Sequence, residues 1–219
     1  MAVSAQVVLF DGFDPLDVIG IYEVLTAGGM VGGATTAELV AAEGPRAVAS
    51  GIPGISLDAR SGLDPDRPGY VVVPGAVGPV EGGPEDGAET IPALLARFAQ
   101  SAAMPLVRRA LANPDVTVAT VCGGSLALAM AGLLQGRTAV TNALGTDLLK
   151  ETGVHVVDAR VVDDGDLLSA GGVTSGLDLG LYVLEREAGP RIARAVEGFF
   201  EFERRGTVWA DRGRVPQPL

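Results

Sequence analysis

Short apolar runs alternate with longer stretches of helical periodicity along most of the chain. The runs that predict buried strands are residues 5–10, 36–42, 70–73, 117–121 and 138–141. A small hairpin is predicted over 48–59, and an Asp-Gly turn joins two further predicted strands, 154–162 and 166–169. The predicted helices are 14–28, 91–111 with a break or kink at Pro105, 125–134, 144–151, 175–188 and 190–203. Residues 75–90 predict a loop, and the tail 204–219 has no clear period.

The alternation of strands and helices predicts an α/β fold, with a mostly parallel sheet covered by helices on both faces. We expect one domain over residues 1–219, with its core at about 5–203. Ligands of such sheets bind beyond the carboxyl ends of the strands. Residues 74–76, Cys122 and residues 171–176 all follow predicted strands, so we expect them to converge there.

Composition narrows the classes of partner. The chain has 219 residues and a net charge of −11, which argues against binding to nucleic acids or anionic membranes. A single cysteine excludes an internal disulfide and a thiolate-rich zinc site, and a single histidine, His155, excludes a multi-histidine site. No leader pattern and no apolar run approaching membrane-spanning length are evident, so we expect a cytoplasmic protein.

The lone cysteine stands between a strand pattern and a helix pattern, directly before Gly123 and Gly124. A side chain at a strand-to-helix turn is raised out of the sheet, and glycines let neighbouring backbone approach it. The N-terminus of the following helix favours a thiolate over a thiol. We therefore predict that Cys122 is a reactive, ionised thiol. The alternative is a buried structural cysteine.

Five motifs make the chain resemble the ThiJ/PfpI superfamily, which has a class I glutamine amidotransferase-like fold, and within it the isonitrile hydratases. In chain order they are Leu9-Phe10, Leu16-Asp17-Val18-Ile19-Gly20 with Glu23-Val24-Leu25, Val73-Pro74-Gly75, Val121-Cys122-Gly123-Gly124-Ser125 with Ala131-Gly132-Leu133-Leu134, and Gly171-Gly172-Val173-Thr174-Ser175-Gly176-Leu177-Asp178.

This resemblance implies a flavodoxin-like three-layer sandwich, a homodimer and a cysteine at a strained nucleophile elbow. It also implies that an acidic side chain of the first helix, here Asp17, lies beside Cys122. Such a carboxyl can share a proton with the sulfur and exchange it during reaction. The alternative for Asp17 is a first-turn acid that complements the helix dipole. The implied reaction needs no cofactor: Cys122 attacks the isonitrile carbon, and the resulting thioimidate is hydrolysed to an N-substituted formamide.

Several backbone and pocket positions are further candidates. The N–H groups that we expect to stabilise developing charge belong to Gly75, Ala76 and Gly123, with tight turns as the alternative. The pocket candidates are Asn142, Ala143 and Gly172.

The chain departs from the hydratase pattern around these candidates. Gly123 stands where threonine is usual, and Ala76 replaces the second glycine of its loop. Asn142 and Ala143 replace a histidine and an aromatic residue, and Ile21 replaces a proline. The nucleophile and the acid are retained, but the surrounding pocket differs.

Other functions therefore stay open at this point. One is a glyoxalase or deglycase acting on small dicarbonyls, and another is a redox or ligand sensor in which Cys122 is oxidised rather than catalytic. His155 lies in a valine-rich segment without an acid two residues later, which favours a structural role and argues against an amidotransferase. Asp178 is interpreted as a helix-capping or loop-bracing acid, with pocket lining as the lesser alternative.

Overall fold

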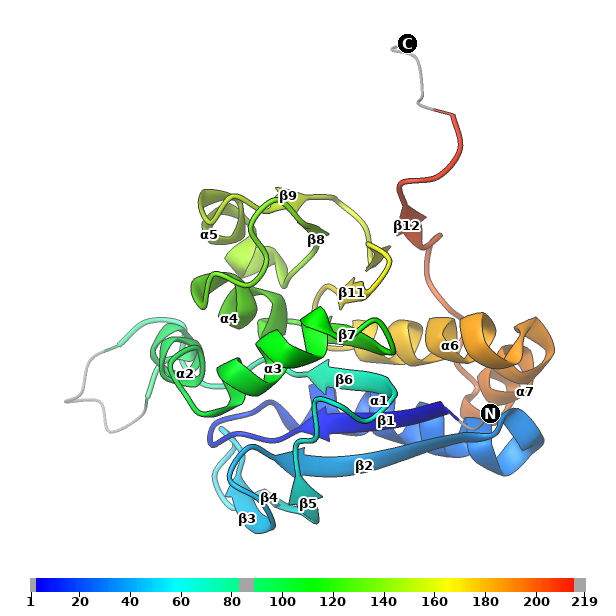
Figure 1. The fold of residues 1–219 in the computed structure, drawn as a ribbon, viewed down its shortest axis with the longest axis horizontal. Helices are drawn as coiled ribbons and strands as arrows, with labels where there is room; N and C mark the ends of the chain where they lie inside the picture. The colour runs from blue at the N-terminus through cyan, green and yellow to red at the C-terminus, as the bar shows by residue number, and fades with distance from the viewer. Residues whose placement is uncertain (1–2, 83–88, 215–219) are drawn as a thin grey trace.

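The computed structural model describes residues 3–82 and 89–214 (Figure 1). Residues 83–88 of the predicted loop and 215–219 of the predicted tail lie outside them. The described strands are β1 (Val3–Val8), β2 (Thr35–Ala41), β3 (Arg46–Ala49), β4 (Ser56–Ala59), β5 (Ser61–Gly62), β6 (Gly69–Val73), β7 (Val116–Val121), β8 (Thr138–Ala139), β9 (His155–Val156), β10 (Val161–Asp163), β11 (Leu167–Ala170) and β12 (Trp209–Ala210).

Eight of these strands form the central sheet, in the order β12-β10-β11-β7-β6-β1-β2-β5. Every neighbouring pair runs parallel except β10 and β11, which are antiparallel. The central strands are buried on both faces, which explains their continuous runs of valine. The mostly parallel sheet predicted from the alternating pattern is confirmed.

Helices cover the sheet on both faces (Figure 1). They are α1 (Pro15–Gly28), η1 (Gly29–Gly33), α2 (Ile91–Phe98), α3 (Ala103–Ala112), α4 (Gly124–Met130), η3 (Ala143–Gly145), α5 (Thr146–Glu151), α6 (Ser175–Ala188) and α7 (Pro190–Phe200). Helices α1, α6 and α7 pack on one another behind the strands in Figure 1, whereas α3 crosses in front of them. The three-layer α/β sandwich is confirmed.

Helix α1 begins as its sequence predicts. The Asp14 side chain accepts a hydrogen bond from the Leu16 N–H at 2.9 Å, and Pro15 occupies the first turn, where no N–H is needed. Ile21 is fully buried and faces Gly180 of α6, so it belongs to the helix-packing core.

Helices α1 and η1 are continuous over Pro15–Gly33, 19 residues with a kink at Gly32, and an 18-residue window of this segment has a mean hydropathy of 1.2. By length and composition this helix is apolar enough to cross a membrane, contrary to the expectation that no run approaches that length. However, its side chains at Val18, Ile21 and Val24 are buried in the protein core. The core helix of a soluble protein meets the same criterion, because burial against a sheet and burial in lipid both select apolar residues.

The predicted helix 91–111 is two helices, but Pro105 does not separate them. The break falls at residues 99–102, and Pro105 lies in the first turn of α3. A proline has no N–H to lose a partner there, so it is compatible with the start of a helix.

The predicted strand 154–162 is also interrupted. Its first part, β9, pairs with β8 in a separate two-stranded sheet, whereas its last part, β10, pairs with β11 in the central sheet. The predicted turn at Asp164-Gly165 is confirmed, with Gly165 at φ +85°. The tail contains β12, which pairs with β10 and was not predicted.

Candidate active site

Cys122 stands at the carboxyl end of β7, between the ends of the neighbouring strands β6 and β11. Its backbone φ angle is +55°. Among the described residues, only three that are not glycine have a positive φ, and Cys122 is one of them. Its N–H donates to the carbonyl oxygens of Ala170 at 3.0 Å and Gly171 at 2.9 Å. These bonds hold an unfavourable backbone conformation in place, which is the geometry of a strained strand-to-helix elbow.

Two glycines allow this turn to pack. A Cβ built on Gly124 would lie 2.3 Å from the Val73 carbonyl oxygen, and one on Gly75 would lie 2.6 Å from the Gly123 nitrogen. Both distances are shorter than van der Waals contact. Close backbone approach therefore requires glycine at both positions. Of the pair that the sequence predicts for this role, Gly124 meets neighbouring backbone, whereas a Cβ on Gly123 would first meet the Leu95 side chain.

The Asp17 carboxyl lies beside this elbow and is fully buried. Its Oδ2 accepts a hydrogen bond from the Gly75 N–H at 2.8 Å. Its Oδ1 has no partner of regular hydrogen-bond geometry within residues 3–82 and 89–214. Burial, followed by the nearby charge of Asp14, raises the pKa of Asp17 to about 8, while Gly75 and the Cys122 thiol act to lower the pKa.

The same burial acts on the thiol. Only 6% of Cys122 is exposed, and desolvation together with the Asp17 charge raises the pKa of the thiol to about 12. The Asn142 amide and the Gly123 N–H act in the opposite direction but do not outweigh burial. Both shifts favour the neutral forms, a thiol at Cys122 and a protonated carboxyl at Asp17, contrary to the ionised sulfur that the sequence predicts. Helix α4 has seven residues and does not offset the desolvation of the sulfur.

The three pocket candidates predicted from the sequence, Asn142, Ala143 and Gly172, lie close to the Cys122 sulfur or next to a residue that does. The Asn142 Nδ2 donates to the Cys122 Sγ at 3.5 Å, and its Oδ1 accepts from the Leu144 N–H. Gly172 lies next to that amide, since a Cβ built there would be 3.5 Å from Nδ2. Ala143 begins the short helix η3 directly after Asn142.

The N–H of Gly75 is already occupied by Asp17, so its expected role as a charge-stabilising donor is not available in this state. Gly75 instead holds the acid. The Gly123 N–H faces the sulfur and acts to lower the pKa of the thiol, and its role as a charge-stabilising donor stays a prediction. Ala76 pairs with Phe13 in an isolated bridge beside the site, and its role as a donor stays a prediction.

Sequence reasoning missed Leu95 of α2. Its Cδ1 would lie 3.0 Å from a Cβ on Gly123, so Leu95 fills the space that a side chain at that position would take. In the sequence Leu95 is one of several apolar residues on an amphipathic helix, and no local signal separates it from the others.

The two other residues considered from the sequence lie away from the sulfur. His155 is exposed on β9. Asp178 is buried and accepts from the Arg160 Nε at 2.6 Å and from the Arg205 N–H at 2.8 Å. Asp178 therefore braces the segment before β10 and the tail against α6.

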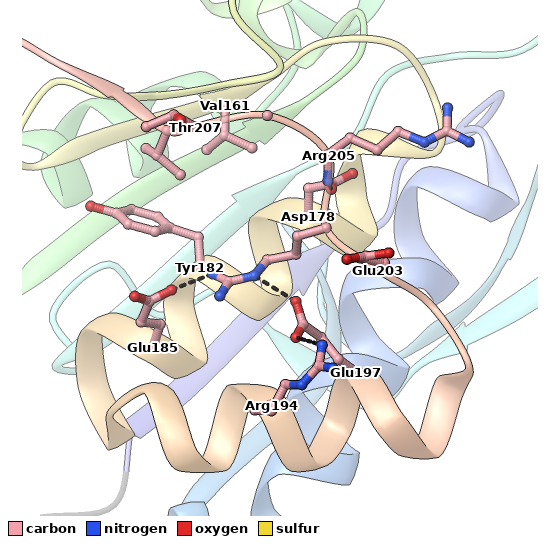
Figure 2. A pocket seen from close by; sticks show the side chains of 12 residues that line it. Val161, Asp178, Tyr182, Glu185, Arg194, Glu197, Glu203, Arg205 and Thr207 are labelled. Carbon is pink, nitrogen blue, oxygen red and sulfur yellow. Dashed lines mark hydrogen bonds and ion pairs between the residues drawn. The ribbon is translucent and has the colours of Figure 1, made fainter.

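Asp178 also lines a cavity of about 470 Å³ between α6, α7 and the tail (Figure 2). Arg204 pairs with Glu185 and Glu197 inside it, and Arg194 pairs with Glu197 at 3.1 Å. Its charged groups thus largely neutralise each other, and none of the predicted catalytic residues lines it. In the part of the chain that the structure describes, no group of three His, Cys, Asp or Glu side chains could hold a metal ion.

Fold and site together define a class: a doubly wound α/β protein with a cysteine on a strand–helix elbow and a buried carboxyl beside it. The chain belongs to the DJ-1/PfpI family, whose model matches residues 3–186.

A sequence comparison with curated proteins shows which member of the family this chain is similar to. Over 85 residues the chain is 42% identical to an isonitrile hydratase from Pseudomonas putida, a match that covers 39% of this chain and 37% of that protein. The match therefore spans little more than a third of the curated relative's length.

Among solved structures, a ThiJ/PfpI family protein from Pseudomonas syringae has a TM-score of 0.76 at 21% identity, over 94% of this chain and 77% of that one. Drosophila melanogaster DJ-1beta has a TM-score of 0.74 at 21% identity, over 93% of this chain and 100% of that one. These two similarities concern the fold.

Proposed function

We propose that the protein is an isonitrile hydratase that uses Cys122 as nucleophile and Asp17 as proton donor and acceptor. The proposal is based on one observation: Cys122, buried and in a strained backbone conformation, lies beside the fully buried carboxyl of Asp17. The Oδ1 of this carboxyl has no hydrogen-bond partner of regular geometry among the described residues. The sequence similarity to an isonitrile hydratase supports the choice of substrate class.

The first step uses both groups in their neutral forms. Because the pKa of Asp17 is about 8, its carboxyl is protonated at neutral pH and can donate a proton to the terminal isonitrile carbon. The sulfur bonds to the same carbon and passes its thiol proton to the Asp17 carboxylate. The product is a thioimidate, R–N=CH–S–Cys122, and Asp17 is again protonated.

In the second step water adds to the thioimidate carbon. Asp17 protonates the nitrogen and accepts a proton from the water. The C–S bond then breaks, and the sulfur recovers its proton as the N-substituted formamide forms. The Asn142 amide and the Gly123 N–H, which already face the sulfur, stabilise negative charge on it as it leaves.

The test is direct. Wild type incubated with an aromatic isonitrile should release the formamide, detected by chromatography, and Cys122→Ala should release none. His155→Gln, an exposed change outside the site, serves as the matched control and should retain the wild-type rate. Absence of turnover by wild type, or turnover by Cys122→Ala, would refute the proposal.

The competing functions give different outcomes in parallel assays. Cysteine-dependent conversion of methylglyoxal without formamide formation would identify a glyoxalase. Selective oxidation of Cys122 by mild peroxide, in a protein inert to both substrates, would identify a sensor. The raised pKa of the thiol disfavours the sensor, because the thiolate is the form that peroxide oxidises.

A further inference from the structure

The loop 171–174, between β11 and α6, supplies an acceptor to the backbone of the nucleophile. The Cys122 N–H donates to the Gly171 carbonyl oxygen at 2.9 Å. Gly172, the next residue, lies beside the Asn142 amide that donates to the sulfur, since a Cβ built on Gly172 would be 3.5 Å from Nδ2. The position of this loop therefore affects both the backbone conformation of Cys122 and the amide that faces its sulfur.

Arg160, which precedes β10, binds both ends of this loop. Its carbonyl oxygen accepts a hydrogen bond from the Gly171 N–H at 3.0 Å, where the loop starts. Its Nη2 donates to the Thr174 Oγ1 at 2.8 Å, where the loop ends. The backbone and the guanidinium of one residue thus hold the loop at two points.

The guanidinium of Arg160 is held in turn by a buried acid. Its Nε donates to the Asp178 Oδ2 at 2.6 Å, and Asp178, in the first turn of α6, is only 2% exposed. The Asp178 Oδ1 accepts from the Arg205 N–H at 2.8 Å, on the tail segment that passes this side chain in Figure 2. Hydrogen bonds between charged groups are stronger than neutral ones, and a buried carboxylate is costly without its partner. Asp178 therefore fixes the guanidinium against α6.

We propose that Arg160 is a positioning residue for the nucleophile: anchored on Asp178, it holds the loop 171–174 against the Cys122 N–H and so maintains the strained elbow. The effect of Arg160 reaches Cys122 through the hydrogen bonds of the loop. The inference rests on the proposed hydratase function for its consequence for turnover. The positioning itself is measurable on the thiol without any substrate.

The first experiment measures how fast iodoacetamide alkylates Cys122, the only cysteine in the chain, by intact mass. Arg160→Gln removes the anchor on Asp178 and loosens the loop. The elbow can then relax from its positive φ, and the sulfur becomes more accessible than its present 6% exposure allows. We expect alkylation about tenfold faster than in wild type. Thr174→Val, an exposed change that removes one of the two holding bonds, should accelerate it less.

Arg137→Gln is the matched control. The Arg137 side chain is 27% exposed, close to the 24% of Arg160. It also binds two acidic residues, through Nε to Asp164 at 2.6 Å and through Nη2 to Asp166 at 2.5 Å. Those acids precede β11, whereas the loop 171–174 follows it. We expect Arg137→Gln to lose stability in urea unfolding and to keep the wild-type alkylation rate. Equal acceleration in Arg137→Gln and Arg160→Gln would overturn the inference, because general destabilisation would then explain both.

Turnover supplies a second readout. In Arg160→Gln the kcat for an aromatic isonitrile should fall about tenfold with KM nearly unchanged, because the nucleophile is misplaced and no substrate contact is removed. Asp178→Asn keeps an acceptor for the Arg205 N–H but loses the charge that anchors Arg160, so it should reproduce this effect. Combining the two changes should add little, since both break one interaction.

The possible failures are distinguishable. Alkylation of both Arg160→Gln and Thr174→Val at the wild-type rate overturns the inference, even if Cys122-dependent formamide release is observed. If Arg160→Gln does not fold, Thr174→Val alone decides by the same measurement. Conversely, if alkylation accelerates in these variants and not in Arg137→Gln, but no isonitrile is hydrated, the positioning role stands and the hydratase proposal fails.

Discussion

The buried carboxyl of Asp17 should make the stability of the protein fall with rising pH. In the folded state Asp17 keeps its proton up to a pKa of about 8, whereas in the unfolded chain it loses the proton near the ordinary value of 3.8. Between these values the folded state binds one proton more than the unfolded state. The free energy of unfolding therefore falls as pH rises through this window and levels off above it.

The magnitude follows from the size of the shift. Each pH unit inside the window is worth about 1.4 kcal/mol. Raising the pH from about 5.5 to about 8 should thus remove about 3 kcal/mol of stability. For a chain of this size that loss corresponds to a decrease in Tm of roughly 6–12 °C.

Asp17→Asn isolates the effect. The amide has the same shape, its oxygen still accepts from the Gly75 N–H, and it does not ionise. Urea unfolding measures the free energy of unfolding of both proteins, and the gap is the value for the variant minus the value for wild type. We expect this gap to rise by about 3 kcal/mol from pH 5.5 to pH 8.5, because only wild type loses stability. Asp147→Asn, at an exposed acid, should follow wild type. A gap that stays constant over this range would show that Asp17 is not protonated in the folded protein.

Three further predictions concern rate, packing and assembly. The kcat/KM for an isonitrile should be constant below pH 8 and fall above it, because Asp17 must be protonated; a rate that rises through pH 8 would contradict this. Gly124→Ala should cost about 1–3 kcal/mol in chemical denaturation because its Cβ meets the Val73 carbonyl, whereas Gly198→Ala, in open space within α7, should stabilise by about 0.5–1 kcal/mol. Equal effects would refute the packing argument. Sedimentation at micromolar concentration should show a dimer, and a monomer alone would contradict the expected assembly.

The order of strands and helices and the position of the nucleophile were readable from the sequence. Both depend on local chemistry: valine runs of strand length, Asp14-Pro15 at a helix start, and paired glycines after Cys122 at a strand-to-helix turn. Convergence of Gly75, Cys122 and Gly171 also followed, because the carboxyl ends of parallel strands share one edge of the sheet. Periodicity alone did not show where the segment 154–162 changes sheets, since β9 and β10 are both short and apolar.

Only the tertiary structure decided the electrostatics of the site. The sequence pattern favoured a thiolate because a helix follows Cys122, but the protonation state depends on how many atoms from distant elements exclude water from the sulfur and from Asp17. The commitment of the Gly75 N–H to the acid and the contact of Leu95 with the elbow have the same origin. Burial and hydrogen-bond partnership are properties of residues brought together from far apart in the chain, and a local pattern of residue types does not encode them.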